Sequence, residues 1–471
     1  MNRYLSNVSE TPFLGYVPRV SLLAIAGLVI AGCVGGQGFH GDASVVDDSR
    51  GAGGASGSGG EIGTGGSAGT GGAPGTGGLR NTGGMLGGGA GALGAGGSAG
   101  AGGVGGVRGS AGGSSGAGGM TSTGGSVGTA GSSGVCSAPI ASTSTRPQLT
   151  SAEAVNFTIG TYLAKSGPFA SPITDNWDPT AGLGDASSLT PNFTVAADGS
   201  GTHTTVQAAL GAATGSARRY ILVKPGTYRE QLSYSGATPV TIYGEGTDAT
   251  QVVIIHNMSA AQGASQTFAV RSNGFQIMNM TISNDFPTPA SGTNIQALAL
   301  QTTGDKIVLQ NVRLHGFQDT VQLQSPSATT IARVYIKNSY IEGDTDCIFG
   351  NATVVIDGSE IHYLSSRRGA SAGVILAPST SVDNSLGFLL IRCNFTADAM
   401  APTNTNHLGR SWDSSGTTPT PNGQAVIRES SIGAYINRAA PWTAAATTAR
   451  PYSATGNRFN EYCNSGPGAA P

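Results

Sequence analysis

Two nine-residue segments of the chain share one frame, and each ends on an aspartate. Asn311-Val-Arg-Leu-His-Gly-Phe-Gln-Asp319 and Asn338-Ser-Tyr-Ile-Glu-Gly-Asp-Thr-Asp346 both read N-x-x-[L/I]-x-G-x-x-D, with equivalent positions 27 residues apart. If copies of a repeat stack, equivalent residues lie one above the other, about 4.8 Å apart. Two carboxylates that close cannot both ionise easily, so one pKa rises, while a nearby cation lowers the other. The spacing predicts a protonated acid beside an ionised nucleophile; the alternative is that both aspartates only shape turns after glycine.

The chain from Asn192 onward supplies elements that could stack in this way. Its short runs of β-branched and aromatic residues alternate with Gly, Asn and Asp turns, which is typical of short strands. The runs lie at 220–224, 240–243, 252–255, 268–270, 275–277, 297–300, 306–309, 334–336, 354–356 and 388–391.

The runs form a loose internal repeat. Four segments are equivalent and begin at spacings of 32, 27 and 20 residues. They are Asn279-Met-Thr-Ile282, the two copies that begin at Asn311 and Asn338, and Gly358-Ser-Glu-Ile361. Repeats of this size built from short strands indicate a solenoid. We therefore predict an all-β fold, a right-handed parallel β-helix that forms a single-stranded solenoid with long loops. A β-sandwich is the alternative, although the two-residue hairpin turns it favours are scarce.

Few helices are expected. Thr150-Ser-Ala-Glu153 matches a capping box and predicts a short N-terminal helix over 154–165. The segment 204–213 predicts a second brief helix, and the Pro-, Asp- and Ser-rich segment 167–191 predicts a wrapping loop.

The amino terminus resembles an export signal. The apolar run from Val20 to Ala31 is shorter than the roughly 20 residues of a membrane span but fits a signal-peptide core. The run leads into Ala31-Gly32-Cys33, which resembles a bacterial lipobox, so residues 1–33 are expected to be a lipoprotein signal peptide with Cys33 lipidated. Val34 follows the cysteine in place of Asp, which by analogy favours anchoring at the outer membrane or cell surface. An ordinary secretory signal cleaved near Gly32 is the alternative.

Composition then divides the chain. More than half of the 77 glycines lie between Gly35 and Val135. Such a segment cannot bury enough apolar surface to offset its ordering entropy, so 34–135 is predicted to be a disordered linker. Residues 136–191 would form an N-terminal extension and 192–471 the catalytic domain.

Net charge limits the classes of binding partner, and the cysteines limit the possible disulfides. The net charge of −2 and the absence of a basic block exclude nucleic acid as a partner, whereas a neutral or weakly acidic sugar polymer would not be repelled. Cys136 and Cys463 flank the folded part, and their pairing would close it. Cys347 and Cys393 could equally be small buried apolar residues.

Five blocks, in order, resemble those of the pectinesterase (pectin methylesterase) family. The resemblance covers about residues 192–469, and Ala377-Pro-Ser-Thr380 resembles its bacterial branch, which includes membrane-anchored lipoproteins. The blocks are Gly226-Thr-Tyr-Arg-Glu230, Gln296-Ala-Leu-Ala-Leu300, Gly316-Phe-Gln-Asp-Thr320, Asp346-Cys-Ile-Phe-Gly350 and Leu408-Gly-Arg-Ser-Trp412.

This chain departs from the family blocks at four positions. The departures are Cys347 for Phe, Ser411 for Pro, Val321 for Leu and Leu298 for Val. None removes a group that does chemistry, but the first two are expected to alter the shape of the substrate groove.

The resemblance implies roles for the catalytic residues. Asp346 would attack a galacturonate methyl ester, Asp319 would protonate the departing methanol and then activate water, and Arg410 would pair with Asp346. Gln296 and Gln318 would stabilise the oxyanion. Because Gln318 directly precedes Asp319, both can serve only if the backbone turns there, as Gly316 would permit.

The resemblance also implies binding residues and partners. Trp412, Phe349 and Thr345 would contact the substrate, since aromatic faces pack on the C–H faces of sugars. The expected protein is a monomer that acts on pectin, uses no cofactor and no metal, and is held to a membrane by its lipid anchor.

Two other classes of function stay open at this stage. A β-helix glycosidase or lyase would also act on pectin, but the glutamine pair would then be unexplained, and the cluster of acids that a calcium-dependent lyase requires is not evident. A non-catalytic polysaccharide binder would not need the complete set of Asp, Arg and Gln.

Overall fold

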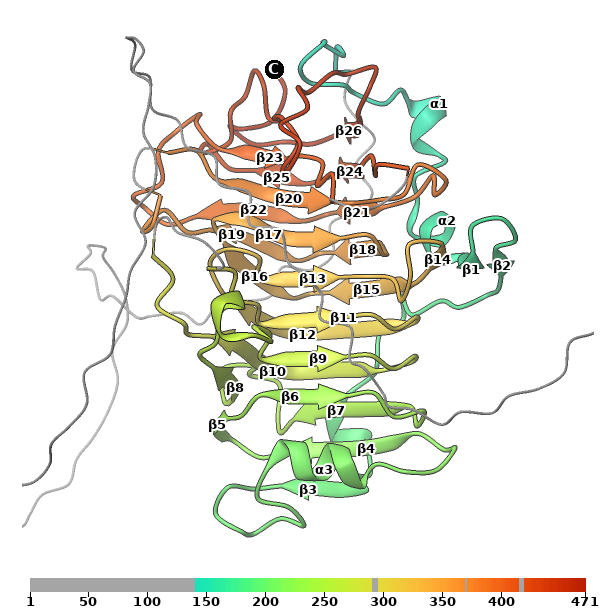
Figure 1. Cartoon of the computed structure of the whole chain (residues 1–471), viewed down its shortest axis with the longest axis vertical. Coiled ribbons are helices and arrows are strands. Elements are labelled where there is room, and N and C mark those ends of the chain that lie inside the picture. The colour runs from blue at the N-terminus through green and yellow to red at the C-terminus, as the bar shows by residue number, and fades with distance from the viewer. Residues whose placement is uncertain (1–139, 290–294, 369–370, 415–418) are drawn as a thin grey trace, which may run out of the picture. The chain divides into compact units, whose positions relative to one another are not determined.

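The computed structural model describes residues 140–289, 295–368, 371–414 and 419–471. In these ranges short strands lie one above another in the successive coils of a parallel β-helix (Figure 1). Parallel ladders join neighbouring coils in one sheet of 16 strands and another of seven. The predicted all-β solenoid is therefore confirmed, and the sandwich alternative is wrong.

The seven-stranded sheet supplies one wall of the coils, in the spatial order β23-β20-β17-β13-β11-β9-β6. Its strands are β6 Leu232–Tyr234, β9 Phe268–Val270, β11 Leu300–Thr302, β13 Val321–Leu323, β17 Thr345–Gly350, β20 Val374–Pro378 and β23 His407–Gly409.

The 16-stranded sheet supplies two further walls, because it bends along its length and β10 and β12 run through the bend. The first wall contains β3 Phe193–Val195, β4 Arg219–Val223, β7 Val240–Gly244, β10 Gln276–Asn284, β12 Ile307–His315, β15 Arg333–Lys337, β18 Thr353–Asp357, β21 Phe388–Ile391, β24 Gln424–Arg428 and β26 Arg458–Tyr462. The second wall continues β10 and β12 and adds β5 Gly226–Arg229, β8 Val252–His256, β16 Tyr340–Gly343, β19 Glu360–Tyr363, β22 Asn394–Ala397 and β25 Ser431–Ile432.

The chain turns from the first of these walls to the second at the asparagine that is repeated in the sequence. Asn279, Asn311 and Asn338 have φ of 53°, 52° and 48°, and Gly358 has 58°. Asparagine and glycine tolerate this left-handed conformation better than other residues, so each copy turns its coil at the same place. The Asn311 amide donates to Asn279 Oδ1 at 2.9 Å, which links two adjacent coils at the corner. The same conformation recurs in later coils at Arg392, Glu429 and Cys463.

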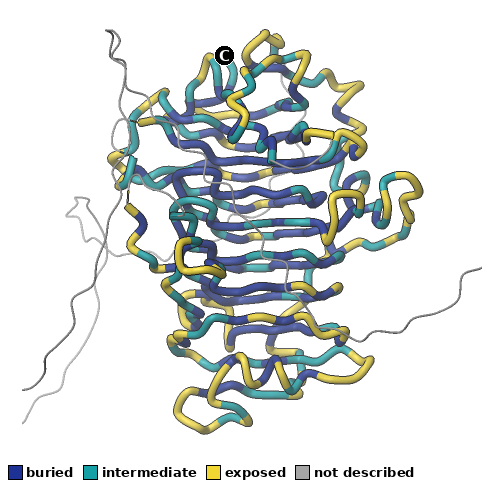
Figure 2. The backbone as a smooth tube through the Cα atoms, in the orientation of Figure 1, coloured by how far each residue is buried: buried dark blue, intermediate teal, exposed yellow. Residues whose placement is uncertain are grey.

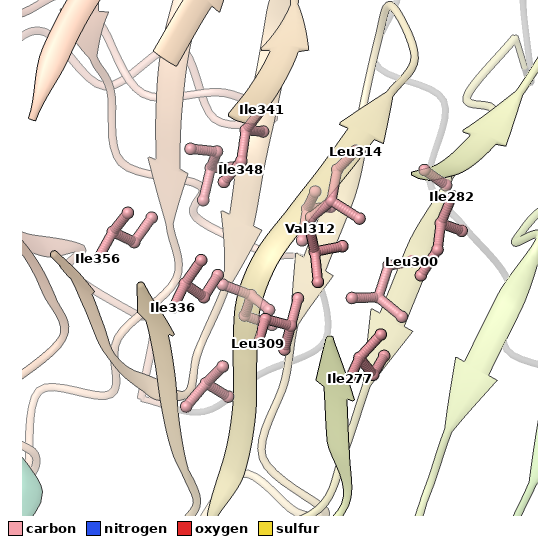
Figure 3. Packing of buried hydrophobic residues seen from close by; sticks show 14 of the residues in the cluster. Ile277, Ile282, Leu300, Leu309, Val312, Leu314, Ile336, Ile341, Ile348 and Ile356 are labelled. Carbon is pink, nitrogen blue, oxygen red and sulfur yellow. The ribbon is translucent and has the colours of Figure 1, made fainter. Parts of the chain in front are cut away.

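The core is the inside of the coils, where apolar side chains stack from one rung to the next (Figure 3). One such stack consists of Ile277, Leu309, Ile336, Ile356, Leu390 and Ile427, all fully buried. Burying each such side chain stabilises the fold by roughly 1.5–3 kcal/mol. The strands are accordingly the most buried part of the backbone and the loops the most exposed (Figure 2).

Both ends of the stack are covered, as a solenoid requires. At the first coils, α3 Val206–Ala212 buries Val206 and Leu210 in the core. At the last coil, the stack ends on the fully buried Glu461, which follows Ile427 in register. Arg146 of the N-terminal segment donates two hydrogen bonds to its carboxylate, at 2.8 and 2.7 Å. The chain therefore begins its described part at the C-terminal end of the β-helix.

The N-terminal segment then runs along the outer face of the first wall. It contains α1 Ser151–Ala154, α2 Ile159–Leu163, β1 Lys165–Pro168, β2 Ile173–Thr174 and the 3-10 turn η1 Ala186–Ser188. Tyr162 and Leu163 pack on outward-facing side chains of the sheet, including Tyr335 and Val355. β1 pairs antiparallel with β2 and with β14 Thr330–Ile331, and a second 3-10 turn, η2 Ala260–Gln262, lies between β8 and β9.

The predicted helix over 154–165 is wrong as one element. The capping box at Thr150 and Glu153 is present, but α1 ends at Ala154 and a new helix begins after Thr158, whose side chain accepts a hydrogen bond from Thr161 N–H. Arg428 on β24 donates to the carbonyls of Ala154 and Phe157, at 2.9 and 2.7 Å, and so satisfies the end of the first helix. The segment predicted as a wrapping loop contains the rest of β1, β2 and η1.

The cysteines fall into two groups. Cys347 and Cys393 are buried free thiols packed in the core, which fits the apolar role considered for them. Cys463 is disulfide-bonded. Cys136 lies outside the described residues, so its pairing with Cys463 stays a prediction.

The predicted signal peptide, lipidation site and linker, residues 1–135, also lie outside the described residues. Within the ranges the structure does describe, no helix has both the length and the apolar character needed to cross a bilayer.

The buried ion pair at the C-terminal end should be needed for stability. Replacing Arg146 by Met leaves the Glu461 charge buried and unpaired, which costs about 3–5 kcal/mol. We expect urea unfolding of the full chain to shift to a clearly lower midpoint. Arg229→Met, which breaks the exposed pair with Asp285, is the matched control and should stay close to wild type. A wild-type midpoint for Arg146→Met would contradict this assignment.

Candidate active site

Asp319 and Asp346 lie opposite each other on adjacent rungs. Val321 of β13 pairs with Ile348 of β17, and Gln318 is bridged to Thr345. The Asp319 N–H donates to the Thr345 carbonyl at 3.0 Å. This register places the two aspartates one above the other, as the repeated frame predicts.

Both aspartates adopt the left-handed conformation, with φ of 62° at Asp319 and 46° at Asp346. A residue in this conformation interrupts the strict alternation of a strand, so neighbouring side chains need not point to opposite faces. The predicted turn between Gln318 and Asp319 is therefore present, but Asp319 itself makes it. Gly316 has a different task, because a Cβ there would lie 2.8 Å from Thr320 Oγ1. The absence of a side chain at Gly316 allows Thr320 to pack closely against the backbone.

Arg410 joins the two rungs to a third. It follows β23 directly, and its guanidinium donates to both oxygens of Asp346, from Nε at 2.9 Å and from the terminal nitrogen at 2.7 Å. The two side chains are only 23% and 12% exposed. A bidentate pair at low exposure fixes the rotamer of the Asp346 side chain and holds a guanidinium against it.

Asp319 has no arginine bonded to its carboxyl group among the described residues. Burial first, and the negative charge of Asp346 second, raise the pKa of Asp319 well above its ordinary value, against a smaller opposing effect of Arg410. A carboxyl group with a raised pKa keeps its proton at pH values where an ordinary aspartate has lost it. The two neighbouring rungs therefore place an arginine-bound carboxyl group beside one that holds its proton more tightly.

Two glutamines lie on backbone segments next to the pair. Gln318 directly precedes Asp319, and Gln296 lies on the connection into β11, where its carbonyl accepts from Ala260 N–H at 2.9 Å and the next N–H, of Ala297, donates to the Gln318 carbonyl at 3.4 Å. The Gln296 side-chain oxygen is buried and has no partner among the described residues. Within the described ranges neither side-chain amide is engaged in a hydrogen bond, so both N–H₂ groups are free to donate.

An apolar patch continues from the acids toward the C-terminal coils. Leu298, Phe349, Ala377 and Trp412 pack together on the outer face of the seven-stranded sheet. The rings of Phe349 and Trp412 meet edge to face with centroids 5.5 Å apart. Thr345 lies beside Asp346, and its hydroxyl oxygen is buried without a partner.

Two of the four departures from the family blocks were expected to alter the shape of the groove, and this stays a prediction. Cys347 is fully buried in the core, where its thiol donates to the Ile375 carbonyl at 3.4 Å. Ser411 is also fully buried, and its hydroxyl donates to Asp413 and accepts from Gly423 N–H, both at 2.8 Å. Neither side chain is therefore exposed on the outer face.

Sequence reasoning missed a second carboxylate–guanidinium pair next to the first. Asp344, two residues before Asp346, is bound by Arg367 from the connection between β19 and β20. The D-x-D spacing of Asp344 and Asp346 was the available signal for the carboxylate. Arg367 lies in no repeated frame, so the sequence did not indicate that it pairs with Asp344.

Comparisons with known proteins identify relatives of this chain. The Pectinesterase family model matches residues 192–471. A pectinesterase of Ralstonia solanacearum is 43% identical over 367 residues, which cover 70% of this chain and 92% of that protein.

Two crystal structures resemble the fold. That of Escherichia coli YbhC has a TM-score of 0.62 at 30% identity and covers 69% of this chain and 96% of its own. That of rice weevil pectin methyl esterase has a TM-score of 0.59 at 30% identity and covers 69% and 98%.

Proposed function

The chain belongs to the pectinesterase family, and on that premise we propose how its own residues release methanol from the methyl esters of pectin. It is a carboxylic ester hydrolase. The observation that carries the proposed mechanism is the pairing of an arginine-bound Asp346 with an Asp319 whose pKa is raised.

In the first half of the reaction, an Asp346 oxygen attacks the ester carbonyl carbon of a galacturonate unit. The carbonyl oxygen becomes an oxyanion that accepts hydrogen bonds from the Gln296 and Gln318 amides. Collapse of this intermediate breaks the bond to the methoxy oxygen, and Asp319 gives that oxygen its proton. Methanol leaves, and the sugar carboxyl stays bound to Asp346 as an acyl-enzyme.

In the second half, Asp319 is a carboxylate and accepts a proton from water. The oxygen of that water attacks the acyl carbon, the bond to Asp346 breaks, and the galacturonic acid unit departs and gives its remaining proton to the solvent. Asp319 again holds a proton and Asp346 is again paired with Arg410, so the cycle closes without any other reactant than water.

The apolar patch supports a place for the sugar ring next to the acids. Trp412, which is partly exposed, would offer aromatic surface to C–H faces of the substrate, and the buried Phe349 would support its ring from below. Thr345, directly before Asp346, is proposed as a further substrate contact on the family resemblance alone.

We also propose that the chain is exported and tethered by a lipid on Cys33 to the outer membrane or cell surface, with residues 34–135 as the spacer, and that it acts as a monomer. The support is the sequence alone, namely the apolar run that ends at Ala31-Gly32-Cys33 and the Gly-rich composition that follows.

The reaction is tested by incubating the full chain with methylated pectin in the presence and absence of a chelator. We expect methanol to appear at equal rates in both, without shortening of the polymer. Asp346→Asn should lose nearly all of this activity, since an amide is a poor nucleophile. New reducing ends or unsaturated products would instead indicate a glycosidase or a lyase, and undiminished methanol release by Asp346→Asn would contradict the proposed nucleophile.

The amide donors are tested by Gln296→Leu and Gln318→Leu. Each removes one hydrogen bond that forms to the oxyanion, so kcat should fall by about 10²–10³ with a smaller change in KM. Gln251→Leu, on an exposed turn between β7 and β8, is the control for the same change of side chain. Equal kcat values for Gln296→Leu and Gln251→Leu would remove Gln296 from the mechanism.

The anchor is tested by mass spectrometry of the protein made in a bacterium that processes lipoproteins. We expect the mature chain to begin at Cys33 and to carry the mass of its acyl chains. Cys33→Ser should release the protein from the membrane fraction. A mature chain that lacks Cys33, or retains it unmodified, would contradict the proposal.

A further inference from the structure

The second carboxylate–guanidinium pair lies directly beside the catalytic acids. Asp344 is fully buried, and Arg367 is 8% exposed. The guanidinium donates to both carboxylate oxygens, from Nε at 2.7 Å and from a terminal nitrogen at 2.5 Å. It thus repeats the bidentate geometry of Arg410 and Asp346 two residues earlier in the chain.

The two residues contact two further segments of the chain, at Phe317 and at Pro289. The Asp344 N–H donates to the Phe317 carbonyl at 2.9 Å, just before Gln318 and Asp319. Asp344 itself leads into Thr345 and Asp346. The third nitrogen of Arg367 donates to the carbonyl of Pro289, on the connection from β10 to β11 that continues to Gln296. The guanidinium also lies 5.4 Å from the centre of the Phe317 ring.

Stability alone is a weak reason for such a pair. Removing two charges from water is unfavourable, and apolar residues of similar size often stabilise a buried site equally well. A fixed ion pair supplies two things that apolar residues do not, namely directional bonds to several backbone segments and a pair of opposed charges.

The opposed charges lie beside Phe317, two residues before the proton donor Asp319. The charged groups around Asp319 are Asp346 on β17, Arg410 after β23, Asp344 before β17, and Arg367 on the β19–β20 connection. Asp344 raises the pKa of Asp319 and Arg367 lowers it, and both effects are smaller than that of Asp346. While the pair is intact, its two charges oppose each other at Asp319.

We propose that Asp344 and Arg367 are positioning residues for ester hydrolysis, which tie the segments of Pro289, Gln318–Asp319 and Thr345–Asp346 into one register and present two opposed charges to the proton donor. This inference rests on the proposed roles of Asp319 and Asp346. Its two halves, the bonds and the balance of charge, are separable by mutation.

The balance of charge is tested with Asp344→Asn and the double variant Asp344→Asn/Arg367→Met. The single variant keeps a guanidinium with no opposing charge, so the pKa of Asp319 should fall. Because the protonated acid is the active form, the alkaline limb of kcat/KM should move to lower pH. The double variant removes both charges, and its limb should return toward that of wild type even though its rate is lower.

The matched control is Asp357→Asn, which breaks the pair with Arg392 on the 16-stranded sheet. Its alkaline limb should coincide with that of wild type. If the alkaline limb of kcat/KM for Asp344→Asn also coincides with that of wild type, the proposed effect of the two charges on Asp319 is wrong. It is equally wrong if the double variant keeps the shift of the single variant. A return of the limb in the double variant cannot come from structural damage, because an added structural defect does not restore a pH profile.

The bonds are tested with Arg367→Lys, which keeps the charge but loses the bidentate geometry and one of its contacts. A misplacement of catalytic groups of this kind lowers kcat by about ten- to a hundredfold, whereas the alkaline limb should stay in place. An unchanged kcat would overturn the positioning role.

The same variants can be read without turnover, which separates this inference from the mechanism. In protein with carbon-13-labelled aspartate, the Asp319 carboxyl is identified by its loss in Asp319→Asn and is titrated directly. Its titration should move down in Asp344→Asn and return in the double variant. Failure of the wild type to release methanol would count against the proposed function. Failure of this titration to move would count against the pair.

Discussion

The register between the rungs of β13 and β17 is the constraint on which the site depends. Parallel pairing places Asp319 opposite Asp346, and the left-handed backbone at both residues turns their carboxyl groups to the same side. A slip of one residue between these rungs would send a carboxyl toward the apolar core, where an unpaired charge is costly. The stacked core and the covered ends of the solenoid hold that register.

Two residues of the same type acquire different chemistry from what each one touches. Asp346 accepts hydrogen bonds from two nitrogens of Arg410, whereas the pKa of Asp319 is raised mainly by burial and by the charge of Asp346. One guanidinium therefore makes the two members of a symmetric repeat different, which is the basis of the proposed roles of nucleophile and proton donor. The proposed role of Asp344 and Arg367 is to fix the surrounding segments.

The repeated frame made much of this predictable from the sequence, because an asparagine that turns each coil also sets the offset of whatever follows it. The shared offset from Asn311 and Asn338 predicted the stacked acids, and the structure adds that both asparagines turn the coil. The frame could not reveal Arg367, since the connection that carries it repeats in no other coil. Strands as short as β13 carry too little periodicity to be identified alone, and the split of the first helix depends on Arg428, which is distant in sequence.

The most direct test of the stacked acids is the titration of the Asp319 carboxyl in the wild-type protein and in Asp346→Asn, observed by carbon-13 resonance without substrate. We expect Asp319 to take up its proton at an unusually high pH in the wild type. This pH should fall in the variant, because a neighbouring negative charge is removed while Arg410 stays. An ordinary aspartate titration in the wild type, or the same titration in both proteins, would contradict the stacking of the two acids.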